Sequence, residues 1–182
     1  AVISDKKREM PAKEFALVIG RGSAGNRHVT TISESVPGLN IQQIGAREAD
    51  RHCLEALKRE PPRFGVIASP ATQHVEMALR LISMGVPLLI EKPFADTASA
   101  ARQVTEAAKS HNGIARVGYV MRYLPEIAIL REVLRSGAIG SPLFAQFTVG
   151  QYLPDWRPDK DYRDSVSASH ALGGGVLLEL SH

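Results

Sequence analysis

Apolar residues in this chain gather in short runs, and the segments between the runs have helical spacing. The first run, Phe15–Ile19, holds five consecutive apolar residues, which is typical of a buried parallel strand. Further strands are predicted at 40–44, 64–68, 88–90 and 114–120. Helices are predicted after residue 25, over 48–59, over 73–84 and from Thr97 to about His111. Alternation of this kind predicts an α/β fold with a doubly wound parallel sheet.

The pattern changes beyond Met121. A helix is predicted over 125–136, and residues 142–152 alternate in the way of a half-buried strand. A polar, irregular connection over 153–170 then leads to a short apolar stretch. One long strand without partners makes a poor domain. We therefore expect a polar arm over 1–14, a first domain over 15–121 and an incomplete α+β domain over 122–182.

Glycines mark the junction between the first strand and the first helix. The segment Gly20-Arg21-Gly22-Ser23-Ala24-Gly25 has the spacing G-x-G-x-x-G, and its strand–turn–helix context predicts a dinucleotide-binding fingerprint. Gly20 permits the tight turn, Gly22 lets the backbone approach a diphosphate, and Gly25 allows close helix–strand packing. The helix N-terminus then attracts the phosphates. A structural turn without a ligand is the alternative.

Composition and charge narrow the class of protein. The net charge of +3 is too small to indicate a nucleic-acid partner, and no apolar run reaches the ~18 residues of a membrane-spanning helix. Residues 1–14 lack the apolar segment of a signal peptide. The only cysteine, Cys53, excludes an intrachain disulfide and favours a reducing compartment, so we expect a cytoplasmic protein. No metal site is predicted.

The choice of cofactor depends on the end of the second predicted strand. An acidic residue roughly 20 positions beyond the fingerprint would bond the ribose hydroxyls of NAD. That position is occupied by Ala46, and Arg47 follows it. A small residue and an arginine suit a 2′-phosphate, which slightly favours NADP over NAD. Glu48 would still serve NAD if the strand ended later, and Arg47 is equally explained as a solvated residue at a helix start.

Five motifs follow one another in an order that resembles a known family. They are the fingerprint at 20–25, the loop from Ser69-Pro70 to His74, Glu91-Lys92-Pro93, Gly118-Tyr119 to Arg122-Tyr123, and GGGVLLELSH at 173–182. Together they resemble the Gfo/Idh/MocA family of NAD(P)-dependent oxidoreductases, which act on sugars, inositols and related polyols. Members are commonly much longer, because a large open sheet completes the second domain. Since such sheets often pair, the resemblance makes a homo-oligomer through the C-terminal sheet an expectation.

The resemblance makes three residues candidates for a catalytic role. The lysine of the family that matches Lys92 lies at the catalytic centre, where an ammonium can bond a substrate hydroxyl and stabilise negative charge on its oxygen. His182 is the candidate general base, because imidazole titrates near the working pH. The family usually has an aspartate four residues before this histidine, whereas here Glu179 lies three before it and could share its helix face. A cis bond between Lys92 and Pro93 is a further hypothesis.

Loops at the strand ends supply the remaining candidate cofactor contacts. These are Ser69, Pro70, Thr72, His74, Glu91 and Lys92. Thr72 is equally explained as a helix cap, and His74 more readily as a packed residue. The segment 118–122 departs from the family, which often carries an asparagine near Val120 or Met121.

The connection over 153–170 suggests the substrate. Trp156 could stack on a sugar-like ring, and Arg157 and Arg163 could hold a carboxylate or phosphate; Tyr162 and Arg122 join them as candidates. These residues predict an anionic, sugar-derived substrate, against the alternative of a solvated loop with one packed tryptophan.

The sequence therefore predicts an oxidoreductase that transfers a hydride between NAD(P) and a hydroxyl or keto group of a sugar, inositol or sugar-derived molecule. Two other hypotheses remain. One is a non-catalytic dinucleotide-binding sensor or scaffold. The other is an interaction protein whose unpaired strand at 142–152 adds to another sheet edge.

Overall fold

The fold is organised around a five-stranded parallel sheet with strand order β2-β1-β3-β4-β5. The computed structural model describes residues 14–49, 57–156 and 158–180. The strands are β1 (Phe15–Ile19), β2 (Asn40–Ile44), β3 (Phe64–Ile67), β4 (Leu88–Ile90) and β5 (Ala115–Val117). Each neighbouring pair is parallel, so the carboxyl ends of all strands meet at one edge of the sheet. The predicted doubly wound α/β sheet is confirmed.

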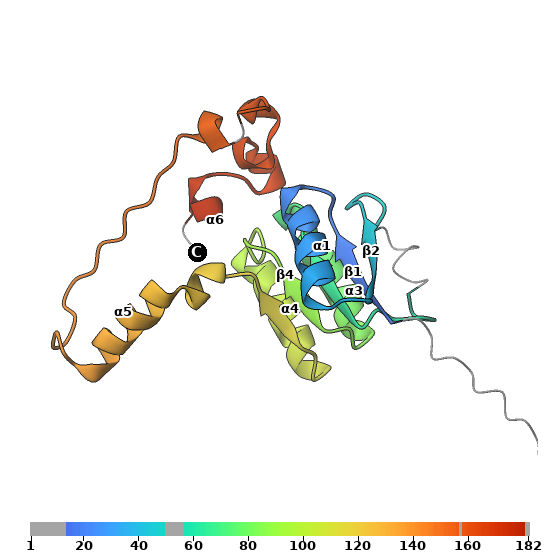
Figure 1. Cartoon of the computed structure of the whole chain (residues 1–182), viewed down its shortest axis with the longest axis horizontal. Helices are drawn as coiled ribbons and strands as arrows, with labels where there is room; N and C mark the ends of the chain where they lie inside the picture. The colour runs from blue at the N-terminus through green and yellow to red at the C-terminus, as the bar shows by residue number, and fades with distance from the viewer. Residues whose placement is uncertain (1–13, 50–56, 157, 181–182) are drawn as a thin grey trace, which may run out of the picture.

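Helices cover both faces of the sheet (Figure 1). Along β1, Phe15, Leu17 and Ile19 pack against side chains of α3 (His74–Ser83) and α4 (Ala98–Ser110). Ala16 and Val18 point to the opposite face, where they pack against Ile32 of α1 (Ser23–Ser35). This burial on both sides explains why the run is apolar without interruption, and each large aliphatic side chain so buried contributes about 1.5–3 kcal/mol.

The residues next to each helix determine where it begins and ends. The Thr97 hydroxyl accepts a hydrogen bond from the Ala100 N–H at 3.1 Å, so the predicted cap of α4 is confirmed. Thr72 caps no helix, and that alternative is wrong. The chain forms a short 3₁₀ turn at η1 (Ala71–Gln73) before α3 begins, and Thr72 lies inside this turn. Helix α5 (Pro125–Ser136) ends at Gly137, which adopts a left-handed conformation.

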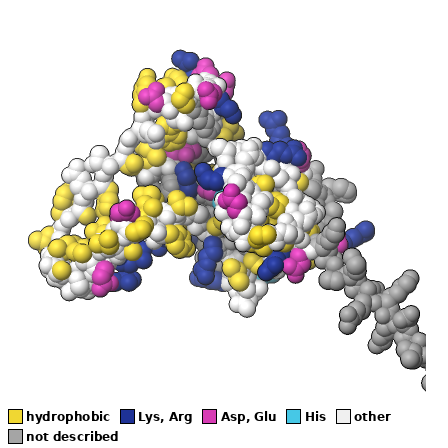
Figure 2. Space-filling view, viewed as in Figure 1, with side chains coloured by type: hydrophobic (Ala, Val, Ile, Leu, Met, Phe, Trp, Pro, Cys, Tyr) yellow, Lys and Arg dark blue, Asp and Glu magenta, His cyan; other side chains and the backbone are white. Residues whose placement is uncertain are grey.

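The predicted strand over 142–152 is wrong. These residues have no regular secondary structure, and Leu143, Phe144 and Phe147 are exposed. A strand needs a neighbour to pair its backbone N–H and C=O groups, and no strand among the described residues lies beside this segment. Figure 1 shows it as a long orange connection, and Figure 2 shows hydrophobic side chains gathered along it and along α5.

The connection ends in a series of short turns that return to the sheet. They are η3 (Leu153–Trp156), η4 (Tyr162–Asp164), η5 (Val166–Ala168) and η6 (His170–Leu172), followed by the short helix α6 (Val176–Leu180). The described residues exclude most of the predicted helix over 48–59, including Cys53. They also exclude nearly all of the predicted arm over 1–14. None of the described helices is long and apolar enough to cross a bilayer.

Candidate active site

The glycine turn between β1 and α1 is closed on one side and open on the other. A Cβ atom at Gly20, where φ is +127°, would lie 2.3 Å from the Ala68 carbonyl oxygen, and one at Gly25 would lie 2.1 Å from the Gly20 carbonyl oxygen. A Cβ atom at Gly22 would meet nothing within 4 Å. Gly20 and Gly25 thus serve packing, whereas Gly22 leaves room for a ligand to approach the backbone.

Helix α1 begins directly at this open side. Among the described residues, no side chain caps its N-terminus, and its first turn holds no acidic residue. The first N–H groups of a helix lack intrahelical partners, and together with the helix dipole they attract anions. The open turn and the uncapped helix fit the diphosphate of a dinucleotide.

A cleft of about 690 Å³ follows the carboxyl edge of the sheet. The sequence-predicted residues that line it are Gly20, Gly22, Ser23, Ala24, Arg47, Ser69, Pro70, Glu91, Lys92, Trp156 and Glu179. They come from four strand ends, from η3 and from α6. The volume lies within the range of small-molecule sites.

The end of the cleft beside β2 carries a small charge cluster. Glu48 forms an ion pair with Arg21, and its other carboxylate oxygen accepts from the Gly45 N–H at 3.2 Å. Arg47 is exposed beside it. From β2, the side-chain amide of Gln43 donates to the Gly20 carbonyl at 2.9 Å, which fixes the glycine turn against the second strand.

Glu91 anchors the loop that carries Lys92. Its side chain is nearly buried, and its carboxylate contacts His28 Nε2 at 2.7 Å and accepts from the Lys92 N–H at 3.1 Å. Burial raises the pKa of Glu91, but the bonds from His28 and the Lys92 N–H, with the nearby Arg27, outweigh this effect and place the pKa below its ordinary value. Glu91 is therefore an ionised link between α1 and the Lys92 loop.

His74 joins the two loops that form the middle of the cleft. Its imidazole is buried, with Nδ1 3.0 Å from the Pro93 carbonyl oxygen and Nε2 2.8 Å from the Ser69 carbonyl oxygen. Burial lowers the pKa of His74, and the surrounding carbonyls oppose this shift only in part. The peptide bond between Lys92 and Pro93 is cis, as hypothesised. His74 does not line the cleft, so the structure places it as a packed residue beneath it.

The pKa of His74 predicts how stability depends on pH. Unfolded His74 takes up a proton near pH 6.5, whereas folded His74 does so only at lower pH. Its stabilising contribution is therefore present above about pH 6.5 and is lost as the pH falls toward the folded pKa. Replacement His74→Gln should flatten this dependence and lower the free energy of unfolding at pH 7.5 by about 1–3 kcal/mol.

Urea unfolding of the whole chain at pH 7.5 and 5.5, followed by circular dichroism, measures this dependence. The exposed His111 provides the control His111→Gln. Glu91 stays ionised across this range because its pKa lies below the ordinary value. A pH dependence that is identical in wild type and His74→Gln would contradict the prediction.

Lys92 and Glu179 meet across the cleft. The Lys92 ammonium donates to the Glu179 carbonyl oxygen at 3.2 Å and to its carboxylate at 3.3 Å. Both side chains are partly buried, with 32% and 16% of their surface exposed. The Ser167 hydroxyl lies 3.4 Å from the other Glu179 carboxylate oxygen. The structure thus brings two of the three predicted catalytic residues together, and the third, His182, lies outside the described residues.

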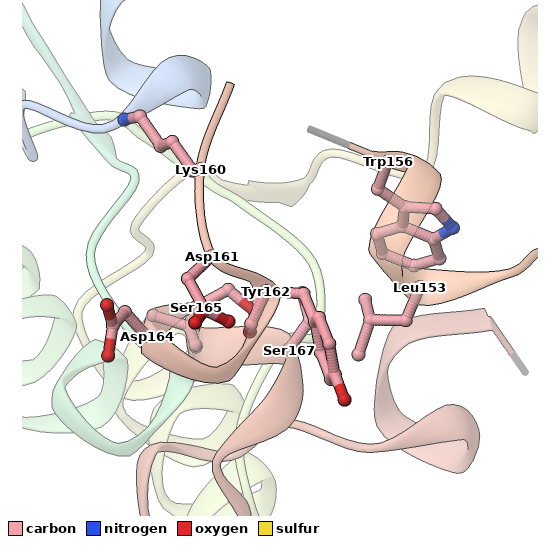
Figure 3. A pocket seen from close by; sticks show the side chains of 9 residues that line it. Leu153, Trp156, Lys160, Asp161, Tyr162, Asp164, Ser165 and Ser167 are labelled. Carbon is pink, nitrogen blue, oxygen red and sulfur yellow. The ribbon is translucent and has the colours of Figure 1, made fainter. Parts of the chain in front are cut away.

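The predicted substrate residues are divided between several places. Trp156 lines the cleft and also a second pocket, which Tyr162 shares (Figure 3). The Arg163 guanidinium donates to Asp161 at 3.3 Å and lies over the Tyr162 ring, 5.0 Å from its centroid. The backbone N–H and the guanidinium of Arg163 hold the pKa of Asp161 below its ordinary value. Arg122 is exposed in η2 (Val120–Tyr123) and lines neither pocket, and Arg157 lies outside the described residues.

Comparison with known proteins identifies the family of the chain. The profile described as an oxidoreductase family with an NAD-binding Rossmann fold, GFO_IDH_MocA, matches residues 16–119, more than half of the sequence. The chain belongs to the Gfo/Idh/MocA family. The resemblance predicted from the five motifs is therefore confirmed.

Relatives within the Gfo/Idh/MocA family include dehydrogenases of polyols and sugars. An inositol 2-dehydrogenase of Rubrobacter xylanophilus is 30% identical over 69% of this chain and 41% of its own length. A levoglucosan dehydrogenase of Pseudarthrobacter phenanthrenivorans is 31% identical over 86% of this chain and 46% of its own length. The chain thus spans about half the length of the curated relatives it matches.

Solved structures show the same fold at low sequence identity. An NAD-binding protein from Listeria innocua has a TM-score of 0.64 and 22% identity, covering 93% of this chain and 52% of its own. A myo-inositol 2-dehydrogenase from Lactobacillus plantarum has a TM-score of 0.59 and 21% identity, and the match covers 71% of this chain and 43% of its own.

Four of the five Gfo/Idh/MocA motifs meet at the cleft. The exception is the segment 118–123, where Val120 and Met121 are exposed. Gly118 lies beside the Glu91 side chain, since a Cβ atom there would be 3.4 Å from a carboxylate oxygen, an ordinary van der Waals contact. The sequence analysis did not identify His28 or Gln43 as residues of the site. The signals that could have indicated them are a histidine near the start of the fingerprint helix and a glutamine inside a predicted strand.

Proposed function

We propose that this chain binds a nicotinamide dinucleotide and acts as an NAD(P)-dependent oxidoreductase on a hydroxyl or keto carbon of a sugar-like substrate. The observation that carries the proposal is the meeting of Lys92 and Glu179 in the cleft that begins at the glycine turn. The relatives named for inositol and levoglucosan support a polyol or sugar as the substrate.

The residues of the cleft suit a nicotinamide dinucleotide. The turn at 20–25 and the start of α1 would hold its diphosphate, and Ser69 and Pro70 would pass beside it. When bound, the nicotinamide supplies the hydride acceptor for alcohol oxidation or the donor for ketone reduction. The role of the protein is then to place the substrate carbon and to manage the proton on its oxygen.

Lys92 is proposed to hold that oxygen. In oxidation, the hydroxyl proton of the substrate would leave to a base on the protein while negative charge develops on the oxygen. A Lys92 ammonium that donates to the oxygen stabilises the negative charge that develops during this step. His182 is the proposed base, and Glu179 is proposed to hold the Lys92 ammonium in place.

We propose a preference for NADP over NAD. Arg21, Arg27 and Arg47 line the cleft, and Glu48, a lining carboxylate that follows β2, is already paired with Arg21. A 2′-phosphate would find cations there and little repulsion. Arg47→Ala should weaken NADPH binding by about tenfold, which corresponds to about 1.4 kcal/mol, and leave NADH binding nearly unchanged.

Calorimetric titration of the whole chain with NADPH and with NADH tests both statements. Arg135→Ala, which removes an exposed arginine from α5, is the matched control. Tighter binding of NADH would reverse the proposed preference, and no heat with either cofactor would remove the proposed function.

A non-catalytic sensor is the second candidate, because the Lys92 ammonium is already engaged by Glu179. Turnover on a panel of sugars and inositols separates it from an enzyme. An anionic group on the substrate, a homo-oligomer and a cytoplasmic location stay predictions of the sequence.

A further inference from the structure

A second pocket adjoins the cleft and shares one wall with it. The pocket has a volume of about 360 Å³ and is lined by residues of 153–156 and 160–167 (Figure 3). Trp156, Val166 and Ser167 line both the pocket and the cleft. The Ser167 hydroxyl contacts Glu179, which in turn bonds Lys92. The side chains of Glu179 and Lys92 therefore connect the wall of this pocket to the position proposed for the reacting oxygen.

The lining of this pocket combines aromatic rings with hydrogen-bonding groups. In Figure 3, Trp156 stands on one side and Asp164 on the other, with Tyr162 between them. An aromatic face packs well on the C–H groups of a sugar ring, and carboxylates and hydroxyls bond its hydroxyl groups. Within the described part of the chain, the Asp164 carboxylate has no hydrogen-bond or ion-pair partner, so it can bind a ligand, whereas the Lys160 ammonium points away from the rings in Figure 3.

Charge decides between a neutral ligand and an anionic one. The charged groups that line the pocket are one ammonium, Lys160, and two carboxylates, Asp161 and Asp164. The nearby Arg163 is occupied by Asp161 and by the Tyr162 ring. Because Arg163 balances the charge of Asp161, Lys160 and Asp164 leave no net positive charge to attract a phosphate or carboxylate, which disfavours a nucleotide or sugar acid here.

We propose that this pocket is a subsite for a second, neutral sugar unit, so that the substrate is a glycoside or disaccharide rather than a free monosaccharide. The inference rests on the proposed function, because it assumes that the first unit lies beside Lys92. The unit that reacts occupies the cleft, and the attached unit occupies the pocket against Trp156 and Tyr162.

Trp156 allows this subsite to be observed directly, because it is the only tryptophan of the sequence. The whole chain, saturated with NADPH, is titrated with maltose, cellobiose, glucose and glucose 6-phosphate while tryptophan emission is recorded. We expect at least one of the two disaccharides to change the emission and to bind about tenfold or more tightly than glucose or glucose 6-phosphate. Asp164→Asn should weaken that binding about tenfold and leave glucose unaffected, because it removes a charged hydrogen-bond partner.

Controls separate this inference from the function on which it rests. Asp159→Asn removes a carboxylate from the same segment outside the pocket and should change nothing. Lys92→Met should weaken disaccharides and glucose alike, because both would place a ring in the cleft. Equal binding of glucose and both disaccharides, tightest binding of glucose 6-phosphate, or an equal effect of Asp159→Asn would overturn the subsite. Loss of the calorimetric signal with both dinucleotides, with the disaccharide response intact, would instead overturn the proposed function.

Discussion

Replacing Lys92 with methionine is expected to lower turnover of a sugar-like substrate by roughly 10²–10³-fold. Methionine keeps much of the length of the side chain but has no ammonium to stabilise charge on the substrate oxygen. The Lys92 ammonium lies in the cleft and bonds Glu179, so its removal affects the reacting end of the site. The glycine turn that would hold the diphosphate belongs to another strand end, so cofactor affinity should change by less than about threefold, well under the 1.4 kcal/mol of a tenfold change.

Absorbance of the reduced nicotinamide measures turnover, and calorimetry measures cofactor binding in the same variant. Lys109→Met, at an exposed position in the last turn of α4, controls for the loss of a lysine. Full turnover in Lys92→Met would remove this residue from the catalytic centre. A wild-type chain that binds NADPH yet turns over no sugar or inositol would favour the sensor.

Alanine at Gly25 is expected to destabilise the fold, whereas alanine at Gly22 should affect only ligand binding. The added methyl group at Gly25 would lie 2.1 Å from the Gly20 carbonyl oxygen, and backbone atoms cannot yield without moving β1 or α1. Overpacking of this kind costs about 1–3 kcal/mol or more. At Gly22 the methyl group meets nothing within 4 Å, but it would occupy the space into which a diphosphate must come.

Thermal unfolding and NADPH titration of the two variants make the comparison. Gly25→Ala should lose stability and cofactor binding together. Gly22→Ala should unfold like the wild type and bind NADPH at least about tenfold more weakly. If Gly22→Ala bound normally, the diphosphate would not lie against this turn.

The sequence predicted the elements that are fully buried or that are stabilised by contacts between residues close together in the chain. Strand β1 is apolar without interruption because helices cover both its faces, and Thr97 caps α4 within its own first turn. The alternating segment at 142–152 failed because alternation specifies a strand only when a partner supplies the hydrogen bonds. Pattern alone does not say whether that partner is present.

The sequence predicted the site residues that belong to short motifs. It did not predict those that depend on contacts between residues far apart in the sequence. The glycine turn, Lys92 and Glu179 stood out from the sequence and lie together in the cleft. The contact of His28 with Glu91 joins residues 63 positions apart, and that of Gln43 with Gly20 joins residues 23 apart. Such contacts depend on strand order and register, which periodicity does not determine.

The loop that carries Lys92 is held from both faces of the sheet. His28 reaches it from α1 through Glu91, and His74 reaches it from α3 through the Pro93 carbonyl. Disabling substitutions should consequently cluster on α1 and α3, although neither helix lines the pocket of Trp156 and Tyr162. An engineer who wishes to change the specificity of the proposed enzyme would leave both histidines untouched and diversify η3, η4, η5 and η6 instead.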